Sequence, residues 1–327
     1  MRNFDYFRAA NPDQAIATHA QTRGAAFLAG GTTLLDLMKI DIMRPPSVID
    51  IHRLAFDQIE TLTDGRVRIG AMVSNTTLAY HPTIRADYAV LSEALLSGAT
   101  TQLRNKATTG GNVMQRVRCG YFRDGVSPCE KREPGSGCAA IDGQNRSLHA
   151  VLGTSERCIA AHPSDMCVAM AAIGATVNVQ GPQGAREIDF LDFHLAPGDT
   201  PWKEHALDDD ELITHITLDA PLRASKSAYL KLRDRASYQF ALASSAVIVV
   251  TADGAIQDVR IALGGVATKP WRAKHAELAL RGRPATRDAF SHAAQVALQG
   301  AVPYAHNGYK IALAQQAIVR NLLSLTS

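Results

Sequence analysis

The chain has 327 residues, of which 46% are hydrophobic and 20% charged, and its formal net charge is +3. These proportions are those of ordinary globular proteins, so they exclude fibrous repeats and extended disorder. The net charge is small and the basic residues are dispersed, which excludes an electrostatic footprint for nucleic acid. No apolar run approaches the roughly 18 residues that span a bilayer, and no signal-peptide pattern opens the chain. We therefore expect neither a nucleic-acid partner nor a membrane.

The first predicted elements, taken in chain order, lead to a glycine turn. A strand at 4–9 precedes a helix that Asn11 caps and that runs to about Gln21. An apolar strand at 25–29 then enters Gly30-Gly31-Thr32-Thr33, and a helix follows. In this order, main-chain N–H groups and a helix start can bind a phosphate. The motif is weak alone, because a tight turn is its commoner meaning, and it lacks the spacing of a Rossmann or P-loop motif.

A second glycine pair follows a region of mixed strands and helices. The pattern predicts a strand at 47–54, a hairpin around Asp64-Gly65, and helices at 74–79 and 83–96. The second turn then reads ATTGGN at 107–112. Two such turns favour a diphosphate or flavin site, although glycine is also selected for positive φ or close packing. Irregular succession of strands and helices indicates an α+β fold.

A long irregular stretch at 116–161 contains four of the five cysteines, Cys119, Cys129, Cys138 and Cys158. Loops longer than about 12–15 residues are usually functional or disordered. Three interpretations of the cysteines remain open: free thiols, a zinc site and a 4Fe-4S cluster. Zinc ligands usually come as pairs separated by two to four residues, and no such pair exists here. Four widely spaced thiolates suit a 4Fe-4S cluster at least as well.

The fifth cysteine belongs to a helical pattern that begins at Ser164 and Asp165. By default these two residues cap the helix. If a cofactor lies at the helix start, they could instead bond its hydroxyls and phosphates. Cys167 is most simply a small core residue. We assign neither His149 nor His162 to a metal, because an isolated histidine is more often a surface or hydrogen-bonded residue.

The remaining chain predicts a hairpin, a strand and a separate C-terminal domain. Gly181-Pro182-Gln183-Gly184 turns the hairpin, and the strand ends at Pro221. Three strands at 227–235, 241–250 and 258–266 come next, followed by helices at 270–280, 286–299 and 308–323. A three-stranded sheet backed by three helices would be a self-contained domain of about a hundred residues.

Several motifs together resemble a known family. FLAGGTTLLDLMK, RPPSVIDI, ATTGGN, AHPSDM and IALGGVATKPWRAKHAE resemble, in order and over nearly the whole chain, the FAD-binding medium subunit of the xanthine dehydrogenase and molybdenum hydroxylase family. The cysteine stretch is more specific and resembles the FAD and 4Fe-4S subunits of bacterial periplasmic aldehyde oxidoreductases. The resemblance implies a FAD-binding PCMH-type domain at 1–220, with subdomains at 1–54 and 55–220 and a 4Fe-4S loop at 114–161. It also implies a CO dehydrogenase flavoprotein-like domain at 221–327.

The resemblance also implies the site residues, none of them catalytic. The residues implied for FAD are Phe27, Leu28, Ala29, Gly30, Gly31, Thr32, Thr33, Leu34, Thr108, Thr109, Gly110, Gly111, Asn112, Ser164, Asp165, Ile213 and Lys231. Those implied for the 4Fe-4S cluster are Cys119, Cys129, Cys138 and Cys158, with Cys167 excluded.

Members of this family work in heterotrimers, which implies two partners. A small subunit carries 2Fe-2S clusters, and a large subunit carries the molybdenum cofactor and oxidises aldehydes to carboxylic acids. This chain would pass the electrons through FAD to an external acceptor. Flavin motifs alone leave open a self-sufficient FAD-dependent oxidoreductase with its own substrate. Co-export on a partner's twin-arginine signal would place the chain in the periplasm, and otherwise we expect it in the cytoplasm.

Overall fold

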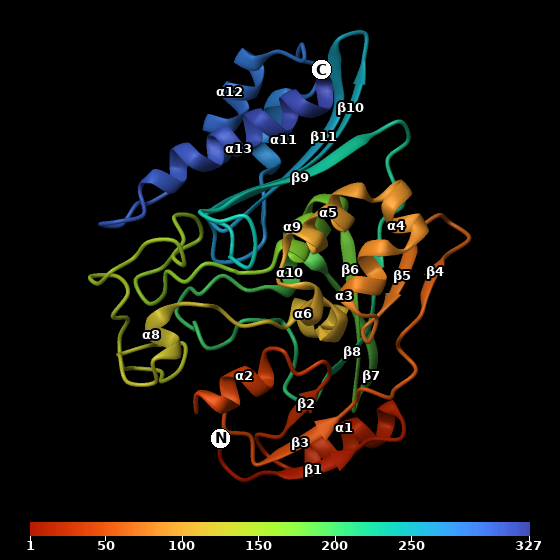
Figure 1. Ribbon diagram of the computed structural model, residues 1–327, viewed down its shortest axis with the longest axis vertical. Coiled ribbons are helices and arrows are strands. Elements are labelled where there is room, and N and C mark those ends of the chain that lie inside the picture. The colour runs from red at the N-terminus through yellow and green to blue at the C-terminus, as the bar shows by residue number, and fades with distance from the viewer.

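The computed structural model describes residues 1–327 and begins with a small parallel sheet. This sheet has the order β1-β3-β2 and lies at one end of the molecule (Figure 1). The Asn11 side chain accepts a 2.8 Å hydrogen bond from the main-chain N–H of Gln14, which confirms the predicted helix cap. The elements are β1 (Asp5–Arg8), α1 (Pro12–Gln21), β2 (Ala26–Leu28), α2 (Leu34–Lys39) and β3 (Ser47–Asp50).

A five-stranded antiparallel sheet forms the centre of the molecule, in the order β4-β5-β8-β6-β7. Its core of 43 buried residues is the largest in the chain. The strands are β4 (Ile59–Thr61), β5 (Val67–Gly70), β6 (Ala175–Gly181), β7 (Gly184–Asp189) and β8 (Leu212–Leu218). The helices packed with it are α3 (Asn75–Tyr80), α4 (Pro82–Asp87), α5 (Ala89–Ser97), α6 (Thr101–Lys106), α7 (Thr109–Val113), α9 (Asp165–Ile173) and α10 (Phe190–Phe193).

One predicted helix is divided in two. The pattern at 83–96 predicts a single helix, whereas the structure ends α4 at Asp87 and starts α5 at Ala89. Tyr88 between them is 2% exposed, and its hydroxyl donates a 2.8 Å hydrogen bond to the carbonyl of Asp219. The helix is therefore interrupted at Tyr88, where this residue bonds to a distant part of the chain, although the local sequence pattern is continuous there.

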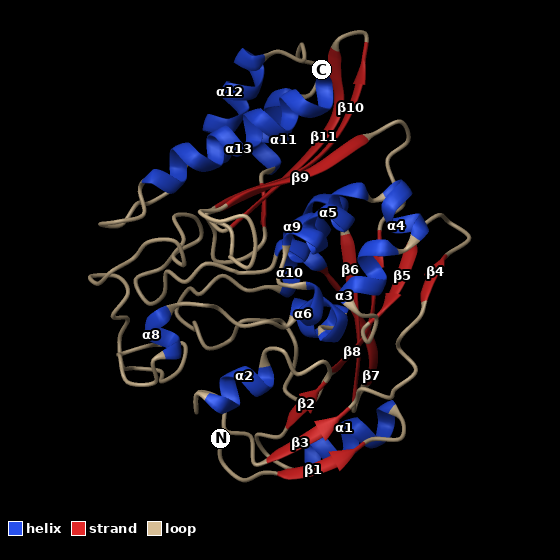
Figure 2. Ribbon diagram, viewed as in Figure 1, coloured by secondary structure: helices blue, strands red, loops and turns tan.

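The C-terminal sheet has four strands, so the prediction of three was wrong. Its order is β12-β11-β10-β9, and three helices cover one face of it around a separate core of 24 buried residues (Figure 2). The additional strand has only two residues, too few for an alternating pattern. The elements are β9 (Lys226–Leu232), β10 (Ala243–Ala252), β11 (Ala255–Gly264), β12 (Trp271–Arg272), α11 (Lys274–Leu280), α12 (Arg287–Ala297) and α13 (Tyr309–Thr326).

The cysteine loop joins α7 to α9, and α8 (Gly120–Arg123) is its only helix. It has a small core of nine buried residues, eight from the loop and Leu37 from α2. The fully buried Lys310 ammonium fixes the loop to the C-terminal domain, since it donates to the carbonyls of Ser147 at 2.6 Å, His149 at 2.9 Å and Gly265 at 2.6 Å. The irregular loop is therefore held in one conformation by hydrogen bonds from the C-terminal domain to its backbone.

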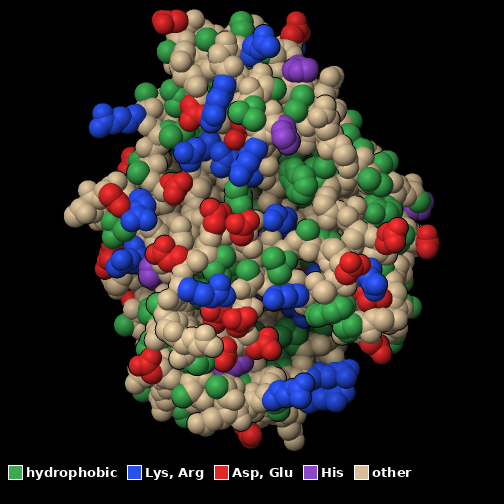
Figure 3. Space-filling view, turned by 180° about the vertical axis from the view of Figure 1, so that it is seen from behind, with side chains coloured by type: hydrophobic (Ala, Val, Ile, Leu, Met, Phe, Trp, Pro, Cys, Tyr) green, Lys and Arg blue, Asp and Glu red, His purple; other side chains and the backbone are tan.

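The surface carries both signs of charge. On the face seen in Figure 3, Lys and Arg side chains lie interspersed with Asp and Glu, with small apolar groups between them. None of the helices combines the length and the apolar character needed to cross a membrane.

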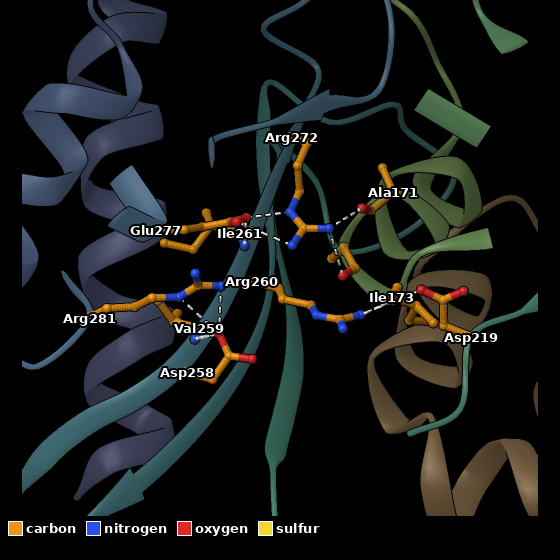
Figure 4. A network of polar contacts seen from close by, with 11 residues as sticks. Ala171, Ile173, Asp219, Asp258, Val259, Arg260, Ile261, Arg272, Glu277 and Arg281 are labelled. Carbon is orange, nitrogen blue, oxygen red and sulfur yellow. Dashed lines mark hydrogen bonds and ion pairs between the residues drawn. The ribbon is translucent and has the colours of Figure 1, made fainter. Parts of the chain in front are cut away.

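Two arginines of the C-terminal domain hold the end of α9 (Figure 4). Arg272 donates to the carbonyls of Ala171 at 2.9 Å and Ala172 at 3.2 Å, and Arg260 donates to the carbonyl of Ile173. Arg272 also pairs with the buried Glu277. The last carbonyls of a helix lack partners within it, and cations stabilise the negative end of its dipole. The contacts therefore join the two domains through α9.

We expect Arg272→Met to lower the free energy of unfolding by about 3 kcal/mol, because it leaves the buried Glu277 carboxylate without its cation. Urea unfolding of the purified chain measures this. Arg281→Met is the matched control, since Arg281 is half exposed in its pair with Asp258 and such pairs contribute about 1 kcal/mol or less. Equal losses in the two variants would show that the buried Arg272–Glu277 pair contributes no more than the exposed Arg281–Asp258 pair.

Candidate functional site

The first glycine turn lies directly against the chain segment that precedes the second. Gly31 has a φ of 75°, in the left-handed region that favours glycine. Gly30 meets main chain: a Cβ there would overlap the carbonyl oxygen of Lys106 and lie 3.2 Å from the Cα of Ala107. The sequence Gly30-Gly31 therefore allows the two segments to approach more closely than side chains would permit.

The second turn forms the start of the short helix α7. The Thr108 hydroxyl accepts a 3.2 Å hydrogen bond from the N–H of Gly111, and the Thr109 hydroxyl donates to the carbonyl of Val73 at 3.0 Å. A Cβ on Gly110 would lie 3.1 Å from that of Ala71. Both threonine side chains are thus occupied in fixing the turn.

The start of α9 is tied to this second turn and to strand β9. The Ser164 hydroxyl accepts from the N–H of Cys167 at 3.1 Å and donates to Oδ1 of Asn112 at 2.8 Å. The Asp165 carboxylate accepts from the Tyr229 hydroxyl at 2.6 Å and from Nζ of Lys231 at 2.7 Å. Burial and the neighbouring carboxylate raise the pKa of Tyr229 well above its usual 10.0, so its hydroxyl remains a donor.

Two cavities meet at the glycine turns. One, of about 570 Å³, extends to the start of α9, and the other, of about 460 Å³, extends to β8. They share Thr32, Thr33 and Gly111 in their linings. The two cavities therefore adjoin at the glycine turns and together form one elongated channel.

Most of the predicted FAD residues line this channel. Leu28, Thr108 and Thr109 do not line it: Leu28 packs beneath the first turn, and the threonines fix the second. Phe27, Ala29, Gly30, Gly31, Thr32, Thr33, Leu34, Gly110, Gly111 and Ile213 line the cavity that extends to β8. Thr32, Thr33, Gly111, Asn112, Ser164, Asp165 and Lys231 line the other.

The shape and the donor groups of the channel fit FAD. This cofactor has two ring systems joined by a diphosphate, and the channel has two cavities joined at glycine turns whose closeness a single Cβ would prevent. Backbone N–H groups in such turns suit phosphate oxygens. Phe27 and Ile213 give the cavity near β8 apolar walls.

Several lining residues escaped the sequence-based prediction. Arg104, Arg118, Leu148 and Phe240 line the cavity near α9, and the Arg118 guanidinium lies 5.1 Å from the ring centre of Phe240. Tyr229 supports Asp165 from β9. Of these residues, only Tyr229 could have been predicted from the sequence, because side chains alternate along a strand and Tyr229 therefore lies on the same face as Lys231.

We expect Lys231→Met to destabilise the protein by about 3 kcal/mol, because it leaves the buried Asp165 carboxylate without a cation. Asp165→Asn in the same chain should restore part of this loss by removing the unpaired charge. Chemical unfolding of the single and double variants, each without flavin, measures both changes. If the double variant is less stable than Lys231→Met, pairing with Asp165 is not the role of Lys231.

The four loop cysteines face one another. Cys119, Cys129, Cys138 and Cys158 line a single pocket, and the backbones of Cys129 and Cys138 pair across it. None forms a disulfide. Burial raises the pKa of Cys119 to about 12 and that of Cys158 to about 11, so these thiols would ionise only beside a cation. A pocket with four cysteines has the donor set of a metal centre.

The sulfur atoms of the loop are too dispersed for a single zinc ion as they stand. They include no group of three within 4.8 Å of one another. Zinc, with Zn–S bonds of about 2.3 Å, holds its thiolates about 3.8 Å apart. Cys167 lies outside this pocket, fully buried in the main core.

Comparison with known proteins agrees with this geometry. Residues 2–221 match the model of the FAD binding domain in molybdopterin dehydrogenase, and residues 227–325 match that of the CO dehydrogenase flavoprotein C-terminal domain. Together the two matches take in almost the whole chain.

Relatives of the full chain are similar over nearly their whole length. The aldehyde oxidoreductase FAD-binding subunit PaoB of Escherichia coli (strain K12) is 49% identical over 97% of this chain and 96% of its own length. The glyceraldehyde dehydrogenase medium chain of Sulfolobus acidocaldarius is 25% identical over 93% of this chain and 91% of its own length. A carbon monoxide dehydrogenase structure from Hydrogenophaga pseudoflava superposes with a TM-score of 0.78 at 26% identity, covering 99% of this chain and 97% of that one. The chain therefore belongs to the FAD-binding medium subunits of the molybdenum hydroxylase family, and it is an oxidoreductase subunit homologous to the FAD-binding subunit of an aldehyde oxidoreductase.

Proposed function

We propose that this chain is the FAD and 4Fe-4S electron-transfer subunit of a heterotrimeric molybdenum-containing aldehyde oxidoreductase. The observation that carries the proposal is the two-part channel between the glycine turns, which has the form and the main-chain donors that FAD requires. The likeness to the aldehyde oxidoreductase subunit PaoB supports the choice of aldehydes as the substrate class.

In this proposal, the chain binds and orients the flavin and performs no chemistry on the aldehyde. Bound FAD supplies the redox chemistry by taking up electrons and releasing them to an external acceptor. The N–H groups of Gly30 to Thr33 would hold its diphosphate. Residues 108–112, whose turn N–H groups bond within the protein, would form the opposing wall. Ser164 and Asp165 would bind FAD from the start of α9, with Lys231 fixing the Asp165 carboxylate.

The loop cysteines are proposed to ligate a 4Fe-4S cluster. The support is that four cysteines share one pocket and that no three of their sulfur atoms lie within 4.8 Å of one another, which is farther apart than around one zinc ion. The cluster would also add to the small core of this glycine-rich loop, to which three of the four cysteines belong.

The proposed partners are a small subunit with 2Fe-2S clusters and a large subunit with the molybdenum cofactor, which oxidises aldehydes to carboxylic acids. We further propose that the assembly reaches the periplasm by co-export with a signal-bearing partner. Cell fractionation tests this: replacing the twin-arginine pair of the partner should leave the chain in the cytoplasm. Periplasmic recovery despite that change would contradict co-export.

Purification of the chain together with the products of the neighbouring genes tests the main proposal. We expect a complex that contains FAD, molybdenum and more iron than the small subunit alone accounts for. A complex without molybdenum would defeat it. A self-sufficient flavin oxidoreductase is the alternative, and reduction of FAD by an aldehyde in the isolated chain would favour it.

A further inference from the structure

A second group of potential metal ligands lies in the main core, apart from the cysteine loop. It consists of His162, just before α9, Cys167, in the first turn of α9, and His194, which directly follows α10. One ligand atom from each residue lies within 4.8 Å of the other two. The residues are 9%, 0% and 3% exposed, respectively. From this cluster we infer a mononuclear metal site for Zn²⁺ or another borderline transition-metal ion.

Both histidines have a ring nitrogen that the protein leaves without a partner. Nε2 of His194 lies 3.1 Å from the carbonyl of Val113, so it donates and carries the proton, which leaves the lone pair on the buried Nδ1. Nδ1 of His194 and Nε2 of His162 have no hydrogen-bond partner. A buried polar group left unpaired costs about 1–3 kcal/mol. A metal ion between the two rings and the thiol would satisfy both nitrogens.

The second nitrogen of His162 does not prevent this. Its Nδ1 receives only a long 3.4 Å contact from the N–H of Ser164. Coordination through Nε2 would place the imidazole proton on Nδ1, and this weak contact with the Ser164 N–H would be given up. The carbonyl of Val113 already fixes the His194 ring in the tautomer that a metal requires, as is usual for metal-binding histidines.

The ligand set determines the kind of ion. One thiolate and two imidazoles suit zinc and copper and disfavour magnesium or calcium, which take oxygen ligands. The thiolate would neutralise part of the ion's charge in a site otherwise walled by Phe190 and Phe193, whose ring centres lie 5.4 Å and 5.0 Å from that of His194. A further histidine, His205, has its ring centre 5.8 Å from that of His194.

Such a site would fix the turn that carries the FAD contacts. The N–H of Cys167 donates to the capping hydroxyl of Ser164, and Asp165 lies between them in the same turn. An ion bound by Cys167 and by His194 would hold this turn against the segment after α10. The inference does not depend on the 4Fe-4S cluster, which would occupy other residues.

Elemental analysis of the purified complex tests the site. We expect one zinc or copper ion per chain in the wild type, its loss in Cys167→Ala and in His194→Gln, and unchanged iron in Cys167→Ala. Val168→Ala, a substitution of similar size in the same buried helix, is the matched control and should keep the ion. Cys129→Ser should also keep it, because that residue belongs to the other pocket. A wild-type complex without such an ion, or one that Cys167→Ala retains in full, would overturn the inference.

X-ray absorption spectroscopy of the wild-type complex tests the inferred metal site directly, so the result does not depend on whether a variant folds. At the zinc or copper edge we expect sulfur at about 2.3 Å and nitrogen at about 2.0 Å, in a mixed shell. A shell of sulfur alone would place the ion among the loop cysteines and refute the assignment.

Discussion

The Cys129→Ser variant is expected to lose the iron of this subunit, about four atoms per chain, because a 4Fe-4S cluster requires four thiolates. Cys129 is 8% exposed, and its backbone pairs with that of Cys138 across the shared pocket. A serine hydroxyl at this position is a poor substitute for the soft thiolate. The measurement is the iron content of the purified complex together with the low-temperature electron paramagnetic resonance signal of the reduced cluster.

The same change should loosen the loop. Cys119, Cys129 and Cys158 belong to its nine-residue core, so loss of the cluster removes a centre that joins distant parts of this core. We expect faster proteolysis within 119–158 while the two larger cores stay protected.

Cys167→Ser is the control for the cluster, because Cys167 lies in the main core and not in the loop pocket. It should keep the full complement of iron. The ligand set is wrong if this variant loses the cluster while Cys158→Ser retains it.

Local signals were sufficient for much of the fold. Asn11 caps α1 as predicted, and its side chain makes the expected hydrogen bond. Asp64 and Gly65 turn the β4–β5 hairpin, where Gly65 has a φ of 83°. Ser164 caps α9. Each of these features depends on residues within a few positions of one another, so the sequence reveals them directly.

Features that depend on distant contacts were missed. Strand β12 is only Trp271–Arg272, and it exists because it pairs with β11. Tyr88 interrupts a helical pattern to reach the carbonyl of Asp219, far along the chain. No periodicity within the segment itself could indicate either feature.

The channel shows the same division. Its glycine turns carry a local pattern, whereas Arg104, Arg118 and Phe240 reach it from separate parts of the chain. The predicted Thr108 and Thr109 lie in the correct turn, yet their hydroxyls bond to Gly111 and Val73 and lie outside the channel lining. A motif identifies the backbone that forms a site, but tertiary packing decides which side chains face it.

The Gly30→Ala variant is expected to bind FAD at least about tenfold more weakly, a loss of about 1.4 kcal/mol. A Cβ at this position overlaps the carbonyl oxygen of Lys106, which is main chain and cannot rotate away. The two glycine turns must then separate, which shifts the main-chain N–H groups of the first turn relative to the opposing wall of the channel. Flavin content of the purified complex, and flavin titration of the stripped protein, measure the loss.

Two further glycines separate a local effect on the flavin from general destabilisation. A Cβ at Gly120 would meet no atom within 4 Å, so Gly120→Ala should change neither stability nor flavin binding. In Gly70→Ala the added Cβ would likewise overlap a main-chain carbonyl oxygen, that of Phe56. Gly70, however, does not line the channel. It should reduce stability by about 1–3 kcal/mol, as overpacking does, without a matching loss of FAD affinity. If Gly30→Ala binds FAD as well as the wild type, the close approach of the two turns is not what shapes the flavin site.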